Sequence, residues 1–314
     1  MWSKILAFFS KNVVKSQPIT PQPPVAEQKP IPQVQVAPPV QAAPVTDPLE
    51  FWKAWCKKAI DISQSFEGSD PWANITGNFD GAYLTCGALG FTWKYNNQPP
   101  MILKFLAQAG AARAKELMPK YWDIYLNAAN LGENGGAGIV ASWSNGSAHV
   151  QKDVSDELRA LWRSPEMIKI QVETAWAMMG NFAYKKCVEG QKYFNLSEPK
   201  FSHYAYWFDQ GVLNGTGNTV QFGEETSTNK ATVIDWCKTT TIGYAIRDLK
   251  NNSEIWDMKF DLSPKDQQAL FIMAYLRAIK SRQQFMPVTM NRRGTVALGD
   301  GFVNGDRRSF DWKV

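Results

Sequence analysis

The sequence predicts a mainly α-helical domain with one small β-sheet, attached to a proline-rich segment. Three observations support this prediction. Apolar residues recur at helical spacing in several long segments of residues 49–314. Residues 74–93 are instead rich in glycine and apolar side chains, a pattern typical of short strands and turns. Residues 16–48 hold ten of the 18 prolines and six glutamines, a composition that cannot build a core.

Composition limits the classes of function. The chain has 314 residues, 44% of them hydrophobic and 13% aromatic, enough for one or two globular domains. Its net charge of +5 mildly favours anionic partners, but no dense Lys/Arg block is present, so we expect no nucleic-acid binding. His149 and His203 have no motif around them that indicates catalysis, and we expect them to be solvated or packed. We expect reduced structural thiols at four widely spaced cysteines: Cys56, Cys86, Cys187 and Cys237.

Residues 1–15 resemble a signal peptide only in part. Ser10 and Lys11 interrupt a short apolar stretch, and no small-residue cleavage site follows, so we expect no clear cleavable signal. The segment is too short to span a bilayer. Two interpretations stay open: an amphipathic helix that docks on a membrane or a delivery machine, and a frayed tail. We expect residues 16–48 to be a flexible, partly polyproline linker.

The folded domain is predicted to begin at residues 47–50. Asp47-Pro48-Leu49-Glu50 offers a helix N-cap, a proline in the first turn and a capping-box glutamate. Apolar spacing extends this helix to about Phe66 and puts Glu67 at its end. The negative end of the helix dipole, with Phe66 and Trp72 nearby, raises the pKa of such a carboxyl, as a general acid requires. The alternative is a solvated glutamate followed by Gly68 as a helix stop.

The remaining elements follow from local signals. Asp80-Gly81 indicates a turn in the glycine-rich segment, and in isolation it predicts an Asx turn with no chemistry. Ser164-Pro165 and Ser263-Pro264 mark two helix starts, and Asp266 adds an acidic third position to the second. Helical spacing predicts helices over residues 100–117, 155–162, 165–184, 200–213 and 264–285.

Residues 80–91, DGAYLTCGALGF, resemble the signature of the glycoside hydrolase family 46 chitosanases, in which a DGRG-like segment leads into T-x-G-x-x-G-F. Glu67 lies upstream, where that family places its general acid. Three further segments match in the same order: residues 161–165, residues 204–209 leading to Asn214-Gly215, and Arg292-Arg293 before Gly299. The resemblance implies a lysozyme-superfamily fold, a two-lobed, mostly α-helical domain with the small sheet flanking a substrate cleft.

Carried over residue by residue, the resemblance implies three catalytic roles. Glu67 would protonate the glycosidic oxygen, Asp80 would activate a water as general base, and Thr85 would help to hold that water. The family inverts, which requires the two carboxyl groups to stand about 6.5–9.5 Å apart. No cofactor and no metal are expected, because no cluster with metal-ligand spacing is visible.

Further residues are candidates for supporting roles. Asp209 and Arg293 match positions of a family ion-pair network behind the acid, with Arg277 or Arg282 as another cation. Four aromatic residues could stack on sugar faces, although core packing is the alternative for each. They are Trp72, Tyr83, Trp93 and Tyr206.

Several departures from the family bear on the substrate. Only 13 positions separate Glu67 from Asp80, fewer than is typical of the family, and Ala82 replaces the arginine of DGRG. Insertions also occur between residues 215 and 261. Chitosan is a polycation, and this chain is itself basic, so the charges do not complement each other. Peptidoglycan, an anionic β-1,4 glycan, fits better.

We therefore expect an inverting peptidoglycan hydrolase of a phage lysis, phage tail or antibacterial effector type. Such an enzyme would act in the bacterial periplasm or cell wall after delivery or release, and an effector would have an immunity protein as a partner. Three alternatives stay open: a chitosanase that acts on chitosan, a catalytically inactive glycan-binding module, and a structural or interaction protein.

Overall fold

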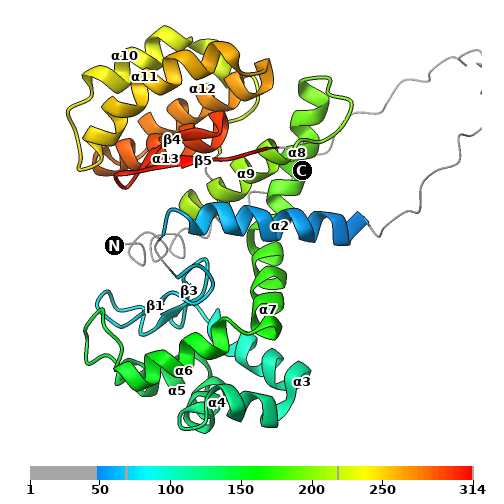
Figure 1. The fold of residues 1–314 in the computed structure, drawn as a ribbon, viewed down its shortest axis with the longest axis vertical. Helices are drawn as coiled ribbons and strands as arrows, with labels where there is room; N and C mark the ends of the chain where they lie inside the picture. Colours follow the sequence, from blue (N-terminus) through cyan, green and yellow to red (C-terminus); the bar gives the residue numbers. More distant parts are fainter. Residues whose placement is uncertain (1–47, 68–69, 218, 313–314) are drawn as a thin grey trace, which may run out of the picture.

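The computed structural model describes residues 48–67, 70–217 and 219–312. The expected N-terminal helix, the linker up to residue 47 and the Asp47 cap lie outside these residues. Helices dominate the fold, and they form two lobes joined by helices that cross the middle of the molecule (Figure 1). The prediction of a mainly α-helical, two-lobed domain with a small sheet is confirmed. None of the described helices is both long enough and apolar enough to span a bilayer.

The lower lobe contains a three-stranded antiparallel sheet of order β1-β2-β3, on the side of the lobe nearest α2 (Figure 1). Thr85 on the middle strand pairs with Thr76 on one side and Thr92 on the other. Buried Gln98 fixes this sheet to the helices, because its amide donates to two hairpin carbonyls while its Oε1 accepts from Tyr125. The lobe consists of β1 (Ile75–Thr76), β2 (Thr85–Cys86), β3 (Phe91–Thr92), α3 (Gln98–Leu117), α4 (Trp122–Asn130), α5 (Gly132–Ala141) and α6 (Lys152–Trp162).

The central helices connect the two lobes. Ser164 caps α7 by accepting the N–H of Met167, as predicted. The helix predicted over residues 165–184 continues to Tyr193, with a π-helical segment, η1, between α7 and α8. Helix α9 is buried from Phe201 to Leu213 and packs against α2. The central elements are α2 (Pro48–Gln64), α7 (Pro165–Ala175), η1 (Trp176–Gly180), α8 (Asn181–Tyr193) and α9 (Phe201–Asn214).

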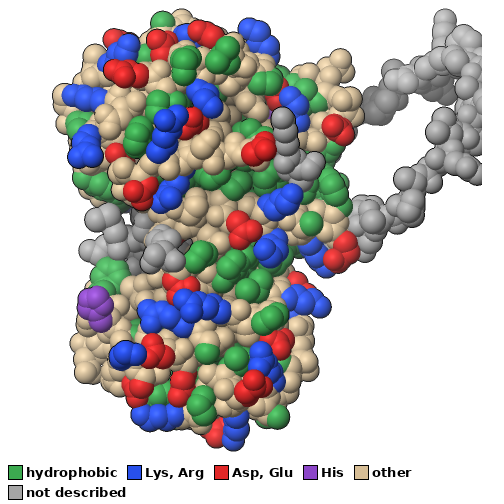
Figure 2. Space-filling model, in the orientation of Figure 1, with side chains coloured by type: hydrophobic (Ala, Val, Ile, Leu, Met, Phe, Trp, Pro, Cys, Tyr) green, Lys and Arg blue, Asp and Glu red, His purple; other side chains and the backbone are tan. Residues whose placement is uncertain are grey.

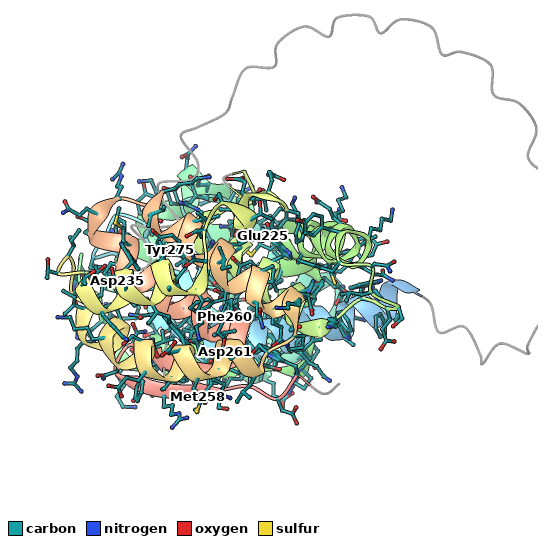
Figure 3. All side chains as sticks on the ribbon, turned by 90° about the horizontal axis from the view of Figure 1, so that it is seen from above. Glu225, Asp235, Met258, Phe260, Asp261 and Tyr275 are labelled. Atoms are coloured by element: carbon teal, nitrogen blue, oxygen red, sulfur yellow. The ribbon has the colours of Figure 1, made fainter. Side chains whose placement is uncertain are left out.

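The upper lobe is a layered group of helices closed by a β-hairpin. Viewed from above, Phe260 lies between helices and packs against Phe271, whereas Met258 on the outer face is 62% exposed (Figure 3). The lobe consists of η2 (Glu224–Ser227), α10 (Lys230–Thr239), α11 (Ile246–Leu262), α12 (Lys265–Ile279), η3 (Gln283–Phe285), α13 (Met286–Leu298), β4 (Asp300–Val303) and β5 (Asp306–Ser309).

One predicted cap in this lobe is wrong. Ser263 does not cap α12; its hydroxyl donates to the carbonyl of Lys259 at the end of α11. Asp266 is buried and accepts hydrogen bonds from Lys200, and its Oδ2 lies 2.7 Å from Nε2 of His203. The helix predicted to run to residue 285 ends at Ile279.

The expectations for the cysteines and histidines agree with the structure. All four cysteines are free and buried, as expected for structural thiols. His203 is packed in the interior beside Asp266, and His149 is exposed. On the face seen in Figure 2, basic and acidic side chains are interspersed over both lobes, which narrow to a waist between them.

Candidate active site

Glu67 lies in the turn that follows α2, one of the central helices that connect the two lobes. The Glu67 N–H donates to the carbonyl of Gln64 at 2.8 Å and closes this turn. Phe66 anchors it, because its buried ring packs edge-on against Phe310 with 5.8 Å between centroids. The Glu67 side chain is 16% exposed, so it is largely desolvated while still reachable from outside.

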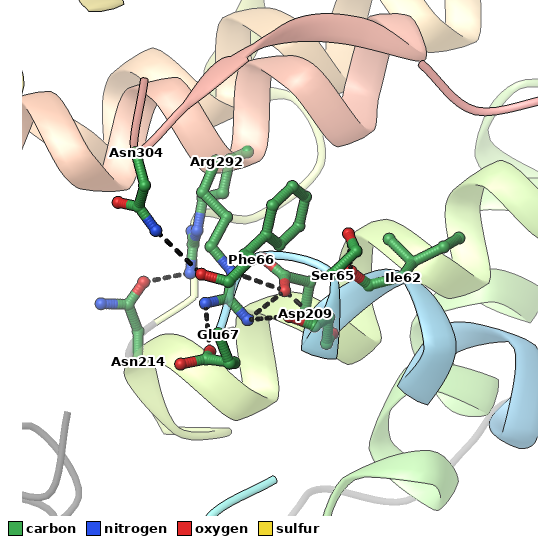
Figure 4. Close-up of polar contacts among 10 residues, drawn as sticks. Ile62, Ser65, Phe66, Glu67, Asp209, Asn214, Arg292 and Asn304 are labelled. Atoms are coloured by element: carbon green, nitrogen blue, oxygen red, sulfur yellow. Dashed lines mark hydrogen bonds and ion pairs between the residues drawn. The ribbon is translucent and has the colours of Figure 1, made fainter. Parts of the chain in front are cut away.

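Arg292 on α13 holds Glu67 and Asp209 together (Figure 4). Its fully buried guanidinium donates to Oε1 of Glu67 at 2.6 Å and, through Nε, to both carboxylate oxygens of Asp209 at 2.8 and 3.0 Å. The Ser63 hydroxyl donates to Oδ1 of Asp209 at 2.9 Å. Two carboxyl groups therefore share one fully buried cation, and only Glu67 of the two carboxyl groups remains partly exposed.

This environment changes the acidity of Glu67. Burial raises the pKa of Glu67 above its ordinary value, and the nearby charge of Asp209 adds to the rise. Arg292 lowers the pKa of Glu67, but its charge is divided between two carboxylates, and the effect of burial is the larger one. The direction agrees with the expectation that Glu67 stays protonated to higher pH than an exposed glutamate.

The expected pairing of Asp209 with Arg293 is wrong, because Arg292 occupies that position. Successive residues of a helix point about 100° apart, so the two arginines of α13 meet different residues of α9. Arg293 is fully buried and donates to the side-chain oxygens of Gln210 and Asn214.

The two other expected cations lie on α12 and directly before η3. Arg277 donates to the Ser281 hydroxyl at 3.2 Å, and burial lowers the pKa of this guanidinium. Arg282 is exposed at the start of η3. In the described part of the chain, the ion pair of Glu67 is made by Arg292.

Asp80 lies in the loop between β1 and β2, where Gly81 and Tyr83 both have positive φ, of 78° and 67°. Oδ1 of Asp80 accepts the N–H of Ala82 at 3.1 Å, so the Asx turn is present. The other oxygen, Oδ2, is buried and has no hydrogen-bond partner among the described residues. One oxygen of the carboxylate thus shapes the loop, and the other is a buried acceptor without a partner in the described part of the chain.

Thr85 begins β2, in the same hairpin as Asp80. It is 7% exposed, and its Oγ1, like Oδ2 of Asp80, lacks a partner in the part of the chain that the structure describes. Buried polar atoms are usually satisfied by protein or by water, so such atoms need an explanation. A bound water would explain both atoms, because a carboxylate oxygen and a hydroxyl can each form a hydrogen bond with water. Glu67 belongs to the central helix layer, whereas Asp80 and Thr85 belong to the lower lobe.

Two of the four aromatic candidates are unsuited to stacking on a sugar. Trp93 is fully buried and its indole N–H donates to the carbonyl of Glu133, while Tyr206 is buried in α9. Both are core residues, so the substrate-binding interpretation is wrong for them. Trp72 and Tyr83 are only half-buried, and both pack against the core, with Lys57 over the ring of Trp72.

The structure adds a residue that the sequence reasoning missed. Asn304 is exposed in the turn between β4 and β5, and its side-chain amide donates to the carbonyl of Phe66 at 2.8 Å, directly before Glu67 (Figure 4). Asn304 and Gly305 have φ of 57° and 90°. The Asn-Gly pair was the available signal, since it favours a tight hairpin turn.

No site for a metal ion is evident in the described residues, where no group of three or more His, Cys, Asp or Glu side chains is placed to hold one.

Comparisons with known proteins give one distant likeness. No protein-family model matches the chain, and no curated protein matches its sequence. Among solved structures, the chain is similar to the native chitosanase of Bacillus subtilis MY002, with 12% sequence identity and a TM-score of 0.39. The match covers 82% of this chain and 98% of that one. This is a likeness of overall fold only, so the site must be interpreted from its own side chains.

Proposed function

We propose that the chain is a glycoside hydrolase that cleaves β-1,4 bonds of peptidoglycan, with Glu67 as general acid and Asp80 as general base. The observation that carries this proposal is the setting of Glu67. Its carboxyl is 16% exposed, has a raised pKa and is held by a buried arginine that it shares with Asp209. A carboxyl kept protonated and fixed in orientation is what glycosidic bond cleavage needs from its acid.

The contacts of Glu67 also define which oxygen carries the proton. A guanidinium only donates hydrogen bonds, and the carbonyl oxygen of a protonated carboxyl is its better acceptor, so Oε1, which accepts from Arg292 at 2.6 Å, is assigned as the carbonyl oxygen. When Glu67 is protonated, its proton is therefore on Oε2, which would give it to the glycosidic oxygen as the bond to the anomeric carbon breaks. A water bound by Oδ2 of Asp80 and Oγ1 of Thr85 would attack that carbon and lose its proton to Asp80, which inverts the configuration.

Charge supports an anionic glycan. The chain carries a net charge of +5. The half-buried Lys94 approaches Gly81, the residue after the proposed base. Its Nζ lies 4.0 Å from the position that a Cβ would occupy at Gly81. An ammonium at this position would attract the carboxylate groups of peptidoglycan and repel the ammonium groups of chitosan.

The test is hydrolysis of purified peptidoglycan and of chitosan by the full chain and three variants. Glu67→Gln and Asp80→Asn should lower the rate on peptidoglycan by about 10²–10⁴-fold, the usual contribution of a general acid or base. Glu254→Gln removes an exposed carboxylate from α11 and should leave the rate unchanged. Clearance of chitosan alone would disprove the substrate assignment, and full activity of Glu67→Gln would disprove the catalytic one.

We also propose that the protein acts on the cell wall from the periplasmic side, as a phage lytic enzyme or a delivered antibacterial effector does. The support is the proposed substrate, because peptidoglycan lies outside the cytoplasmic membrane. Expression with an added periplasmic export signal should lyse bacteria, whereas the same chain with Glu67→Gln should not. Survival of cells that export the active chain would contradict this proposal. Residues 1–15 as a docking segment and an immunity protein as a partner stay predictions.

A further inference from the structure

Two arginines of the upper lobe have no acidic partner among the described residues. Residues 267–299 contain five arginines and lysines and no aspartate or glutamate, so a carboxylate beside these cations must come from another segment. Arg292 and Lys280 have such carboxylates within 2.7 Å. Arg277, which is half-buried, and Arg293, which is fully buried, donate to uncharged groups instead.

Each of these two guanidinium groups also has one nitrogen without a partner. Nη1 of Arg277 donates to the Ser281 hydroxyl at 3.2 Å. The two terminal nitrogens of Arg293 donate to the side-chain oxygens of Gln210 and Asn214. In contrast, Nε of both arginines is buried and has no hydrogen-bond partner in the described part of the chain. Unpaired buried donors on charged groups are costly, so these two N–H groups need an explanation.

The two arginines belong to one cluster between α9, α12 and α13, which contact one another pairwise. The Ser281 hydroxyl accepts from Arg277 and lies 3.5 Å from the hydroxyl of Thr289. Thr289 is one helical turn before Arg293 on α13, and residues at this spacing lie on the same face of a helix. A short chain of contacts thus connects Arg277 to the face of α13 that carries Arg293.

Electrostatic effects agree with this placement. Burial lowers the pKa of Arg293 to about 10, and the charge of Arg277 adds to the fall, so Arg293 still carries its charge at pH 7. Burial raises the pKa of Tyr206 on α9 to about 12, whereas the charges of both arginines lower it. Both guanidinium groups therefore act on the Tyr206 hydroxyl, which is neutral at pH 7 and offsets neither charge.

The protein offsets only part of this positive charge. Arg293 bonds to Asn214, the last residue of α9, and Arg277 lies in the last turn of α12. A helix C-terminus is equivalent to roughly half a negative charge, so the two helix ends offset about one of the two positive charges. The carboxylate of Asp209 also acts on Arg293, but it is paired with Arg292. A water at Nε would accept a hydrogen bond and leave the charge unchanged.

We propose that Arg277 and Arg293 bind a small monovalent anion of the size of chloride between α9, α12 and α13, through their Nε–H groups. A single negative charge matches the charge that the helix ends leave. A carboxylate or phosphate pairs best with two adjacent nitrogens of one guanidinium, and the terminal nitrogens of Arg293 already donate to amide oxygens. A spherical anion needs only single N–H donors, one from each arginine. The half-buried Arg277 gives the site access to solvent.

Thermal unfolding of the full chain tests this proposal without any glycan. Sodium chloride replaces sodium gluconate at constant ionic strength, because gluconate is too bulky for a site lined by buried side chains. A ligand that binds only the folded state stabilises it. A dissociation constant of about 15 mM would raise Tm by about 3–6 °C at about 0.15 M chloride. A Tm that does not respond to chloride would overturn the proposal.

Matched variants separate anion binding from general effects of salt. Arg277→Gln removes one donor and one charge at a half-buried position, and its Tm should no longer depend on chloride. Arg247→Gln removes an exposed arginine of α11 and should keep the full dependence of the wild type. If Arg277 serves packing alone, Arg277→Gln will lose the same number of degrees in both salts, and the anion site is then wrong. Sulfate that raises the wild-type Tm more than chloride, but not that of Arg277→Gln, would also contradict a small monovalent anion.

Bromide, which scatters X-rays anomalously, locates the site. Crystals of the full chain soaked in sodium bromide should show an anomalous peak within hydrogen-bond distance of Nε of both Arg277 and Arg293, and crystals of Arg277→Gln should lack it. The absence of this peak from wild-type crystals would refute the site. So would a peak without a chloride-dependent Tm, since it would mean binding at crystal concentration only. Because neither experiment involves hydrolysis, failure here leaves the proposed function intact, and an inactive chain with a chloride-dependent Tm leaves the anion site intact.

Discussion

Replacement of Arg292 by methionine should lower the free energy of unfolding by about 3–5 kcal/mol at neutral pH, the usual cost of removing one partner from a buried ion pair. The guanidinium is fully buried, and nitrogens of it lie 2.6 Å from Glu67 and 2.7 Å from Asp209. The side chains of these carboxylates are only 16% and 1% exposed. Without the arginine, the charge of Asp209, and that of Glu67 whenever it is ionised, would have no buried cation beside it.

The expected loss is large enough to measure by thermal unfolding. For a domain of this size, 1 kcal/mol corresponds to about 2–4 °C in Tm, so Arg292→Met should unfold about 6–20 °C below the wild type. Tryptophan fluorescence suits the measurement because several tryptophans are buried. Arg247→Met removes an exposed arginine of α11 and should change stability by no more than about 0.5 kcal/mol.

The pH dependence identifies the cause of the loss. At acidic pH, protonation of Glu67 removes uncompensated charge from the folded variant, so the difference in stability between variant and wild type should shrink. A packing defect alone would give the same difference at every pH. Equal Tm changes for Arg292→Met and Arg247→Met, or a loss that does not depend on pH, would refute the charge-sharing explanation.

Three further predictions concern pH and charge. Because burial raises the pKa of Glu67 above its ordinary 4.5, kcat should persist above that pH and then fall as the acid deprotonates; a rate that rises steadily into the alkaline range would contradict this. Lys94→Gln should raise KM for peptidoglycan about 2- to 5-fold at low salt and leave KM for an uncharged N-acetylated oligosaccharide unchanged; an equal rise for both substrates would argue against charge recognition. Burial acts to raise the pKa of Asp266, but hydrogen bonds from His203 and Lys200 hold it at about 2, below its ordinary 3.8. The contribution of Asp266 to the free energy of unfolding is therefore present above pH 3.8 and is lost as pH falls through 2. Urea unfolding should therefore show a larger loss for Asp266→Asn at pH 7 than at pH 2, and equal losses would disprove this linkage.

The sequence predicted the elements that local signals define. The α2 helix and the Ser164 cap were expected correctly, because each depends on side chains within one or two turns. Helix α13 was not predicted. Its residues from Pro287 to Leu298 are all buried, so it has no polar face, and hydrophobic spacing identifies a helix only when one face is polar.

The complete burial of α13 also explains why the sequence reasoning assigned Arg293, and not Arg292, as the partner of Asp209. Which of Arg292 and Arg293 meets Asp209 depends on how α13 is rotated against α9, and a helix buried on all sides carries no sequence pattern that indicates its rotation. Trp93 and Tyr206 were misjudged for a related reason, since an aromatic side chain suits both a core and a sugar-binding surface. Glu67 was placed correctly at the end of α2, but its burial depends on residues more than 200 positions away.

Mass spectrometry of purified peptidoglycan digested by the full chain tests the central claim most directly. Water-mediated cleavage predicts muropeptides with new reducing ends that incorporate ¹⁸O when digestion is carried out in H₂¹⁸O, and Glu67→Gln should lower their yield by about 10²–10⁴-fold. Anhydro-sugar ends without ¹⁸O, or equal yields from the wild type and Glu67→Gln, would contradict the assignment of Glu67 as the acid of a hydrolytic reaction.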